Sequence, residues 1–232
     1  MRTILRTHDR ADRAILRDVG AIALAALAIG VSFGAIATAA DLPGWLVIAM
    51  SVLVFAGGAQ FMAVGLLAVG SPVGAVLGGL LLNARHLPFG LAVGEEIADR
   101  WRGRLIGSHL LIDESVAFAM AQTDPVRRRR AYWLTGATLF VTWNVGTVLG
   151  TLLGGAVADP TAFGLDAAFP AGLLALLLPS LREPVARWVA LVGAAVALLA
   201  TPVLPAGVPV LLALTGLLVV AVRRRKKEVA SA

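Results

Sequence analysis

The chain has 232 residues, of which 59% are hydrophobic and 15% charged, and its mean hydropathy is +0.87. So apolar a composition cannot form the polar surface of a soluble globule, which excludes a water-soluble protein and indicates an all-α, polytopic membrane protein. The net charge of +6 comes from short basic clusters at residues 2–17, 127–130 and 223–227. Because short basic flanks stay cytoplasmic, these clusters predict orientation in the bilayer and not a nucleic-acid surface. The absence of cysteine excludes disulfides and thiolate metal ligands.

Windows of about 19 residues predict eight apolar segments along the chain. They are Val19 to Ala40, Trp45 to Val69, Pro72 to Val93, Leu105 to Gln122, Tyr132 to Val157, Ala167 to Leu181, Ala186 to Ala200 and Val208 to Val222. The first is a membrane span and not a cleaved signal, because its ~22 residues exceed the roughly 7 to 15 of a signal core. We expect a basic cytoplasmic arm at 1–18, one transmembrane domain at 19–222 and a basic cytoplasmic tail at 223–232.

The charge pattern predicts that both termini are cytoplasmic. With the N-terminus inside, the basic clusters fall inside, and the loops at 41–44, 158–166 and 201–207, which contain no lysine or arginine, fall outside. The exception is GEEIADRWRGR, residues 94–104, which this count places outside with three arginines. Either its acidic residues balance the arginines, or a neighbouring segment is re-entrant and the chain has seven spans.

Two predicted segments carry polar and charged residues near their centres. Asn83, Arg85 and His86 lie in the third segment, and Asp113 and Glu114 lie in the fourth. An unpaired charge at the centre of a membrane helix costs about 2.5 to 3.5 kcal/mol, so these groups are expected to face one another or a polar cavity. Arg85 and Asp113 have matched predicted depths, about 12 to 14 Å below one surface, which allows an ion pair. This pair either locks the two segments together or takes part in function.

The same segments contain the ingredients of a proton relay. His109 and Asp113 are four residues apart and would share one face of a continuous helix, whereas Glu114 would point about 100° away. Histidine titrates near neutrality and burial favours an uncharged carboxyl, so these groups and His86 could pass protons. A metal site is less favoured, because no dedicated third ligand is present. The serines beside His109 are weak nucleophile candidates, since adjacent helical residues diverge in direction, and we expect neither catalysis nor a cofactor.

The sequence VFAGGAQF, residues 54–61, lies at the centre of the second segment. Gly57 and Gly58 each weaken a helix by about 1 kcal/mol, and Gln60 follows them. One hypothesis is close helix packing, for which membrane helices use small residues. The other is a broken helix, whose second half presents free N–H groups that could bind a carboxylate. Spacing alone does not separate these hypotheses.

Further glycines occur in G-x-x-x-G pairs that predict helix contacts. They are Gly30/Gly34, Gly74/Gly78, Gly146/Gly150 and Gly150/Gly154. The first and third pairs end a predicted span before an acidic outside loop, which suggests a parallel repeat of residues 1–123 and 131–232.

Five stretches occur in the order SVLVFAGGAQFMAVGLL (51–67), LLNARHLPFG (81–90), LLIDESVAF (110–118), TWNVGTVLG (142–150) and FGLDAAFPAGLLALLL (163–178). Together they resemble the AzlC-type branched-chain amino acid permeases. The resemblance implies a bacterial inner-membrane exporter of leucine, isoleucine and valine, and also of methionine. It also implies a small hydrophobic partner subunit of the AzlD type. Pro88 departs from the family pattern after NARHL, and we expect a local kink there.

A zwitterionic amino acid needs donors for its carboxylate, an acceptor for its ammonium group and an apolar wall for its side chain. The predicted substrate-binding residues are Gly57, Gly58, Gln60, Asn83, Arg85 and Asn144. The predicted proton-coupling or ion-pair residues are Arg85, His86, His109, Asp113 and Glu114, and the predicted wall is Phe55, Phe61 and Phe89. No ATP-binding motif occurs, so an ion gradient, most simply of protons, would drive transport. The alternatives are a passive channel for small solutes and a membrane scaffold subunit without transport of its own.

Overall fold

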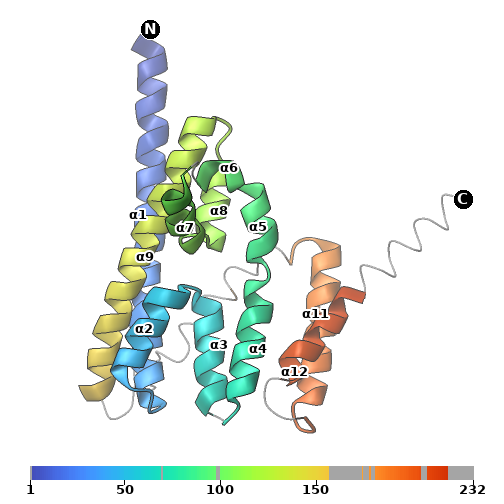
Figure 1. Ribbon diagram of the computed structural model, residues 1–232. Coiled ribbons are helices and arrows are strands. Elements are labelled where there is room, and N and C mark those ends of the chain that lie inside the picture. The colour runs from blue at the N-terminus through green and yellow to red at the C-terminus, as the bar shows by residue number, and fades with distance from the viewer. Residues whose placement is uncertain are drawn as a thin grey trace, which may run out of the picture.

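The computed structural model describes residues 2–68, 70–97, 100–156, 181–204 and 208–218, together with Leu174 and Leu178. Over these residues the chain is all-helical, as predicted, and contains no strand (Figure 1). The elements are α1 (Arg2–Ala39), α2 (Gly44–Val54), α3 (Gly57–Ala68), α4 (Pro72–Asn83), α5 (His86–Ala92), α6 (Gly94–Ile97), α7 (Trp101–His109), α8 (Asp113–Met120), α9 (Pro125–Ala156), α11 (Pro184–Ala200), α12 (Val208–Leu212) and η2 (Ala213–Leu217). The predicted segment at 167–181, the loop at 158–166 and the basic tail lie almost entirely outside the described residues.

The two longest helices, α1 and α9, lie side by side and run in the same direction (Figure 1). Glycines bring their backbones together, because a Cβ atom on Gly30 would lie 2.6 Å from the Trp143 carbonyl oxygen. Further along both helices, a Cβ atom on Gly154 would lie 2.9 Å from the Ala35 carbonyl oxygen. Equally close contacts surround Gly34, Gly146 and Gly150. The predicted packing role of these glycine pairs is therefore confirmed.

The predicted second segment is two half-length helices that fold back on each other, and not one span. α2 begins at Gly44, against the Thr151 side chain near the end of α9. The chain reverses at Phe55, whose φ of 35° lies in the left-handed region. The Gln60 side-chain amide then donates to the Met50 carbonyl oxygen at 2.8 Å. A straight helix forbids this bond, because ten residues would separate the two by about 15 Å. The broken-helix hypothesis is confirmed.

The third segment is one helix with a break at its middle. It runs antiparallel to α3, so that Gly58 of α3 lies beside Leu82. Pro88 explains the break between α4 and α5, because it lacks the N–H that would donate to the Ala84 carbonyl oxygen. That oxygen accepts instead from the Leu87 N–H at 3.1 Å, which tightens the turn. The expected kink is present, one turn before the proline.

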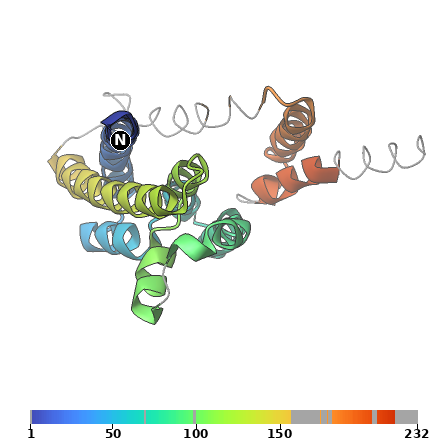
Figure 2. The ribbon, with the colours of Figure 1, turned by 90° about the horizontal axis from the view of Figure 1, so that it is seen from above.

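The fourth segment is a second pair of half-length helices. α6 lies at the start of α9, where Glu96 forms an ion pair with Arg128 at 2.8 Å. α7 then lies across the direction of α9 and reaches it with its last residues (Figure 2), where the Tyr132 hydroxyl donates to the Gly107 carbonyl oxygen at 2.7 Å. The helix ends at His109, and α8 returns to the start of α9, to which only residues 121–124 join it. The prediction of one continuous helix over 105–122 is therefore wrong, whereas the alternative of one re-entrant segment and seven spans stays a prediction.

The α2–α3 hairpin removes the exception in the charge pattern, because residues 94–104 fall outside only if the second segment crosses. α6 (residues 94–97) lies at the same end of α9 as Arg127–Arg130, because Arg128 contacts Ala92 and Glu96. We call this the basic end and the opposite end of α9 the far end. The N-terminus of α1 also lies toward the basic end, at the top of Figure 1. We call α2–α3 the far hairpin, because α2 begins at the far end of α9, and α7–α8 the basic hairpin, because α8 ends near the basic end.

A crossing helix followed by a half-length hairpin occurs twice, in opposite directions. α1 runs from the basic end to the far end, and the far hairpin follows it. α4 and α5 run back to the basic end, and the basic hairpin follows them. The parallel repeat of 1–123 and 131–232 stays a prediction, because residues 157–173 lie outside the described part of the chain.

The remaining helices form a separate group, set apart from α1 and α9 in Figure 2. There α11 packs against η2 through Gly193 and Gly216. In the part of the chain that the structure describes, two helical stretches are long and apolar enough to cross a bilayer, Ile15–Ala39 and Pro125–Gly154. The predicted count of seven or eight spans is not confirmed, because two predicted segments fold as hairpins and the third is broken.

Candidate functional site

The tips of the two hairpins meet at the middle of α9. Phe140 lies at the centre of this 32-residue helix. The ring of Phe55, at the tip of the far hairpin, lies 5.0 Å from it, and the ring of His109, at the tip of the basic hairpin, lies 5.5 Å from it. The Phe55 and His109 rings are themselves 6.2 Å apart. We call the region where both tips, the α4–α5 break and α9 meet the junction.

A hydrogen bond joins one tip to the other across the junction. The His109 Nε2 atom lies 2.7 Å from the Val52 carbonyl oxygen in the last turn of α2. The last carbonyl groups of a helix have no partner within it, so this ring N–H, donating to Val52, satisfies one of them. The dipole of α2 also favours a histidine side chain beside the C-terminus of this helix. The bond closes the seam between the two hairpins.

An ion pair joins the basic hairpin to the helix break. The Arg85 Nη1 atom lies 2.7 Å from the Asp113 Oδ2 atom, so the predicted pairing of these residues is confirmed. Asp113 is the first residue of α8, where the positive end of the helix dipole also favours its carboxylate. The two side chains are 37% and 32% exposed, so the pair is only partly shielded. Glu114 is partly buried and close enough for the charges of both residues to act on it.

The same region holds buried polar atoms that have no hydrogen-bond partner. They are Gln60 Oε1, Asn83 Oδ1, Arg85 Nε and Asp113 Oδ1. Gln60 is fully buried, and its amide nitrogen is used to close the far hairpin. Most buried polar atoms in proteins have a partner, so this group of three acceptors and one donor is a candidate binding surface.

The predicted carboxylate-binding glycines lie at the start of α3. The first hydrogen bond into this helix runs from the Gln60 N–H to the Ala56 carbonyl oxygen at 2.9 Å, after the N–H groups of Gly57 and Gly58. Gly57 also lies against the Trp143 ring, where a Cβ atom would be 2.8 Å from the indole. The packing and broken-helix hypotheses therefore both hold for this pair, and binding of a carboxylate here stays a prediction.

Some predicted site residues are used elsewhere in the fold. The prediction that His109 and Asp113 share one helix face is wrong, because the helix ends between them at residues 110–112. His86 Nδ1 lies 2.9 Å from the Asn83 carbonyl oxygen of its own segment. Of the predicted apolar wall, Phe55 lies at the junction, whereas the Phe61 ring packs on Phe33 of α1 and Phe89 packs near Val93.

Sequence reasoning missed the polar contacts that hold the far hairpin on α9. The buried Ser51 hydroxyl donates to Asn144 Oδ1 at 2.8 Å and lies 3.1 Å from the Thr147 hydroxyl. Asn144 donates in turn to the Phe140 carbonyl oxygen at 2.8 Å, so its amide positions α2. Its predicted role in substrate binding stays a prediction. The available signal was the spacing of Asn144 and Thr147, which places two polar groups on one face of an apolar helix.

Known proteins are similar to the chain over the helices that form the junction. The AzlC protein family matches residues 21–157, a stretch that includes both hairpins, the helix break and α9. The branched-chain amino acid transport protein AzlC of Bacillus subtilis strain 168 is 25% identical over 201 residues, which cover 84% of this chain and 78% of that protein. No solved structure matches the chain significantly. Among the described residues, no group of three or more histidine, aspartate and glutamate side chains could hold a metal ion.

Proposed function

The chain belongs to the AzlC family, and we propose on this premise that it is a secondary transporter exporting branched-chain amino acids across the bacterial inner membrane. Its substrates are leucine, isoleucine and valine, and also methionine. The similar Bacillus subtilis protein is a branched-chain amino acid transport protein, which supports the substrate class. The observation that carries the proposal is the junction, where an ion pair and buried acceptors lie halfway along α9. Charged groups placed inside a membrane domain are costly unless they serve a site.

Both hairpins are too short to cross a bilayer. α7 and α8 are about 14 and 12 Å long, and α2 and α3 about 17 and 18 Å, against a hydrocarbon core of about 30 Å. The two hairpins are the second and fourth of the eight predicted segments. If neither crosses, six crossings remain, and this even number places both termini on one side of the membrane. The basic end is then cytoplasmic, and the arginines of residues 94–104 obey the charge rule.

The junction offers each part of a zwitterionic amino acid a partner. The N–H groups at the start of α3 and the Arg85 guanidinium can bind the carboxylate. Asp113, whose Oδ1 atom has no hydrogen-bond partner, can accept from the ammonium group, as can Glu114. Phe55 supplies an apolar surface for the side chain. The charges of Arg85 and Asp113 cancel each other when no substrate is bound. A zwitterionic substrate adds one positive and one negative charge, so the site is also neutral with substrate bound.

Export is coupled to protons in this proposal. His109 holds the seam between the hairpins, so its protonation state can bias which hairpin moves. Asp113 and Glu114 lie side by side at the start of α8, so one carboxylate can stay paired with Arg85 while the other exchanges a proton. A small hydrophobic AzlD-type subunit completes the transporter. The chain itself is not an enzyme.

The proposal is tested by leucine efflux from preloaded cells with the chain alone, the partner alone, both together and neither. We expect export only where this chain is present, with full rate when both are. Transport by the partner alone would make this chain a scaffold and overturn the proposal. In inverted membrane vesicles, leucine accumulation should collapse when a protonophore is added. Equilibration that ignores the protonophore would instead indicate a passive channel.

A further inference from the structure

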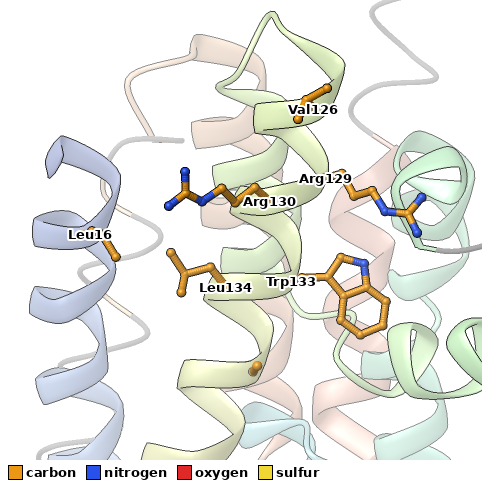
Figure 3. A pocket seen from close by; sticks show the side chains of 7 residues that line it. Leu16, Val126, Arg129, Arg130, Trp133 and Leu134 are labelled. Carbon is orange, nitrogen blue, oxygen red and sulfur yellow. The ribbon is translucent and has the colours of Figure 1, made fainter. Parts of the chain in front are cut away.

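α9 carries two tryptophans, whose ring N–H groups have different surroundings. Trp133 lines a surface groove near the basic end (Figure 3), and its Nε1 atom donates to the Glu96 carbonyl oxygen at 3.1 Å. Trp143 lies further along the helix and is only 8% exposed. Its Nε1 atom has no hydrogen-bond partner in the part of the chain that the structure describes. An indole N–H can only donate, so the Trp143 side chain lacks an acceptor.

The Trp143 ring is held by aromatic neighbours from two other helices. It stacks on the Phe33 ring of α1, with centroids 5.9 Å apart and an interplanar angle of 26°. The edge of the Phe61 ring of α3 meets it at a centroid distance of 6.4 Å. These contacts restrict rotation of the indole. The direction of its N–H is therefore set before a ligand binds, which lowers the entropy cost of binding.

The ring lies against the start of α3. A Cβ atom on Gly57 would lie 2.8 Å from the Cη2 atom of Trp143 and 3.4 Å from its Cζ2 atom. Cζ2 is two covalent bonds from Nε1, so the indole N–H lies close to the Gly57 backbone. The N–H groups of Gly57 and Gly58 precede the first hydrogen bond of α3, which runs from Gln60 to Ala56. The indole N–H and the first N–H groups of α3 thus form one group of donors.

A buried acceptor nearby is also unsatisfied. Gln60 of α3 is fully buried, and its Oε1 atom has no hydrogen-bond partner among the described residues. Trp143 could donate and Gln60 could accept, yet the two side chains do not bond to each other. Leaving such groups unpaired inside a protein is costly, so this region is suited to a ligand that carries hydrogen-bonding groups of its own.

We infer that Trp143 is a further substrate-binding residue, whose Nε1–H donates to the substrate carboxylate beside the N–H groups of Gly57 and Gly58. This inference rests on the proposed function. It also orients the amino acid, with its carboxylate against α3 and α9 and its ammonium group toward Asp113 of the basic hairpin. A hydrogen bond to a charged acceptor corresponds to a roughly 10- to 150-fold change in affinity.

Trp143→Phe tests the inference, because it keeps an aromatic ring and removes the N–H. The matched control is Trp133→Phe, which removes a ring N–H from the same helix outside the junction. Binding of leucine and of isoamylamine, which is leucine without its carboxylate, is measured with the full chain in detergent. We expect Trp143→Phe to weaken leucine binding roughly 10- to 150-fold and to leave isoamylamine binding unchanged. Trp133→Phe should change neither.

A second measurement keeps every tryptophan in place. Fluorine NMR is recorded on the native chain with fluorotryptophan at its five tryptophan positions, and each signal is assigned from the corresponding substitution by phenylalanine. We expect leucine to shift the Trp143 signal and to leave the Trp133 signal in place. Isoamylamine, which has no carboxylate, should shift neither signal.

Three results would overturn the inference and leave the transport proposal standing. The first is equal leucine affinity in the native chain and in Trp143→Phe. The second is an equal loss of leucine and isoamylamine binding, which would make Trp143 a packing residue. The third is a Trp143 signal that does not respond to leucine, which would assign the N–H to a bound water or to no ligand. A native chain that neither binds nor exports leucine would instead overturn the proposed function itself.

Discussion

Removing Arg85 should expose whether its ion pair with Asp113 has a role beyond holding the fold together. An exposed pair contributes up to about 1 kcal/mol, whereas removing one partner of a buried pair costs about 3 to 5 kcal/mol. The two side chains are 37% and 32% exposed, so Arg85→Ala should fall between these limits. We expect a loss of about 2 kcal/mol, which is roughly thirtyfold in the unfolding equilibrium.

The double variant Arg85→Ala, Asp113→Asn separates structure from function. It leaves no stranded charge, so thermal stability in detergent should recover most of the loss seen in Arg85→Ala. Leucine efflux should stay lost, because the variant removes both the Arg85 guanidinium, which binds the substrate carboxylate, and the Asp113 carboxylate, which binds its ammonium group. Glu114→Gln combined with Arg85→Ala is the matched control, since it removes the adjacent carboxylate and should not restore stability. Full efflux with normal pH dependence in the Asp113 double variant would refute the reasoning and leave the pair as a structural lock.

Three further predictions concern the fold. Because the chain has no cysteine, Ser71→Cys and Arg102→Cys report topology alone, and a membrane-impermeant thiol reagent should label the first from outside and the second from inside. Labelling on the opposite sides would restore the eight-span interpretation. Gly58→Leu should abolish leucine binding yet leave membrane insertion normal, because a Cβ atom there meets only the flexible end of the Leu82 side chain at 3.2 Å; retained affinity would leave this glycine as packing alone. Gly150→Ala should lower thermal stability by at least 2 kcal/mol through overlap with the α1 backbone, while Gly65→Ala, with open space around it, should not.

Apolar length and charge predicted the helical class, the long helices α1 and α9 and the Arg85–Asp113 pair. Both the pair and the glycine contacts follow from local features, namely the depth of a charge along a segment and the spacing of small residues. Hydropathy did not reveal the hairpins, because a half-length helix followed by its return has the same composition as one span. The tip at residues 110–112 is Leu-Leu-Ile, which contains no residue that breaks a helix.

Two signals in the sequence did point to the hairpins. Gly57 and Gly58 marked the start of α3, and the arginines of residues 94–104 violated the charge rule only if the second segment crossed. Contacts between segments that are far apart in the chain could not be predicted from the sequence. The hydrogen bond between His109 and Val52 joins residues 57 apart. Its acceptor is a backbone oxygen, which every residue has, so the amino acid at position 52 does not reveal the bond.

The far hairpin depends on a helix that is synthesised long after it. Ser51 is bonded to Asn144, 93 residues later, and Phe55 lies on Phe140. At ~5 to 20 residues per second, a ribosome needs roughly 5 to 20 seconds to make that interval. During this time α2 and α3 are an apolar stretch without their partner and can lie across the bilayer as one span. The final topology is therefore decided after α9 inserts, and a chain truncated before Pro125 should carry the far hairpin in a different orientation from the complete protein.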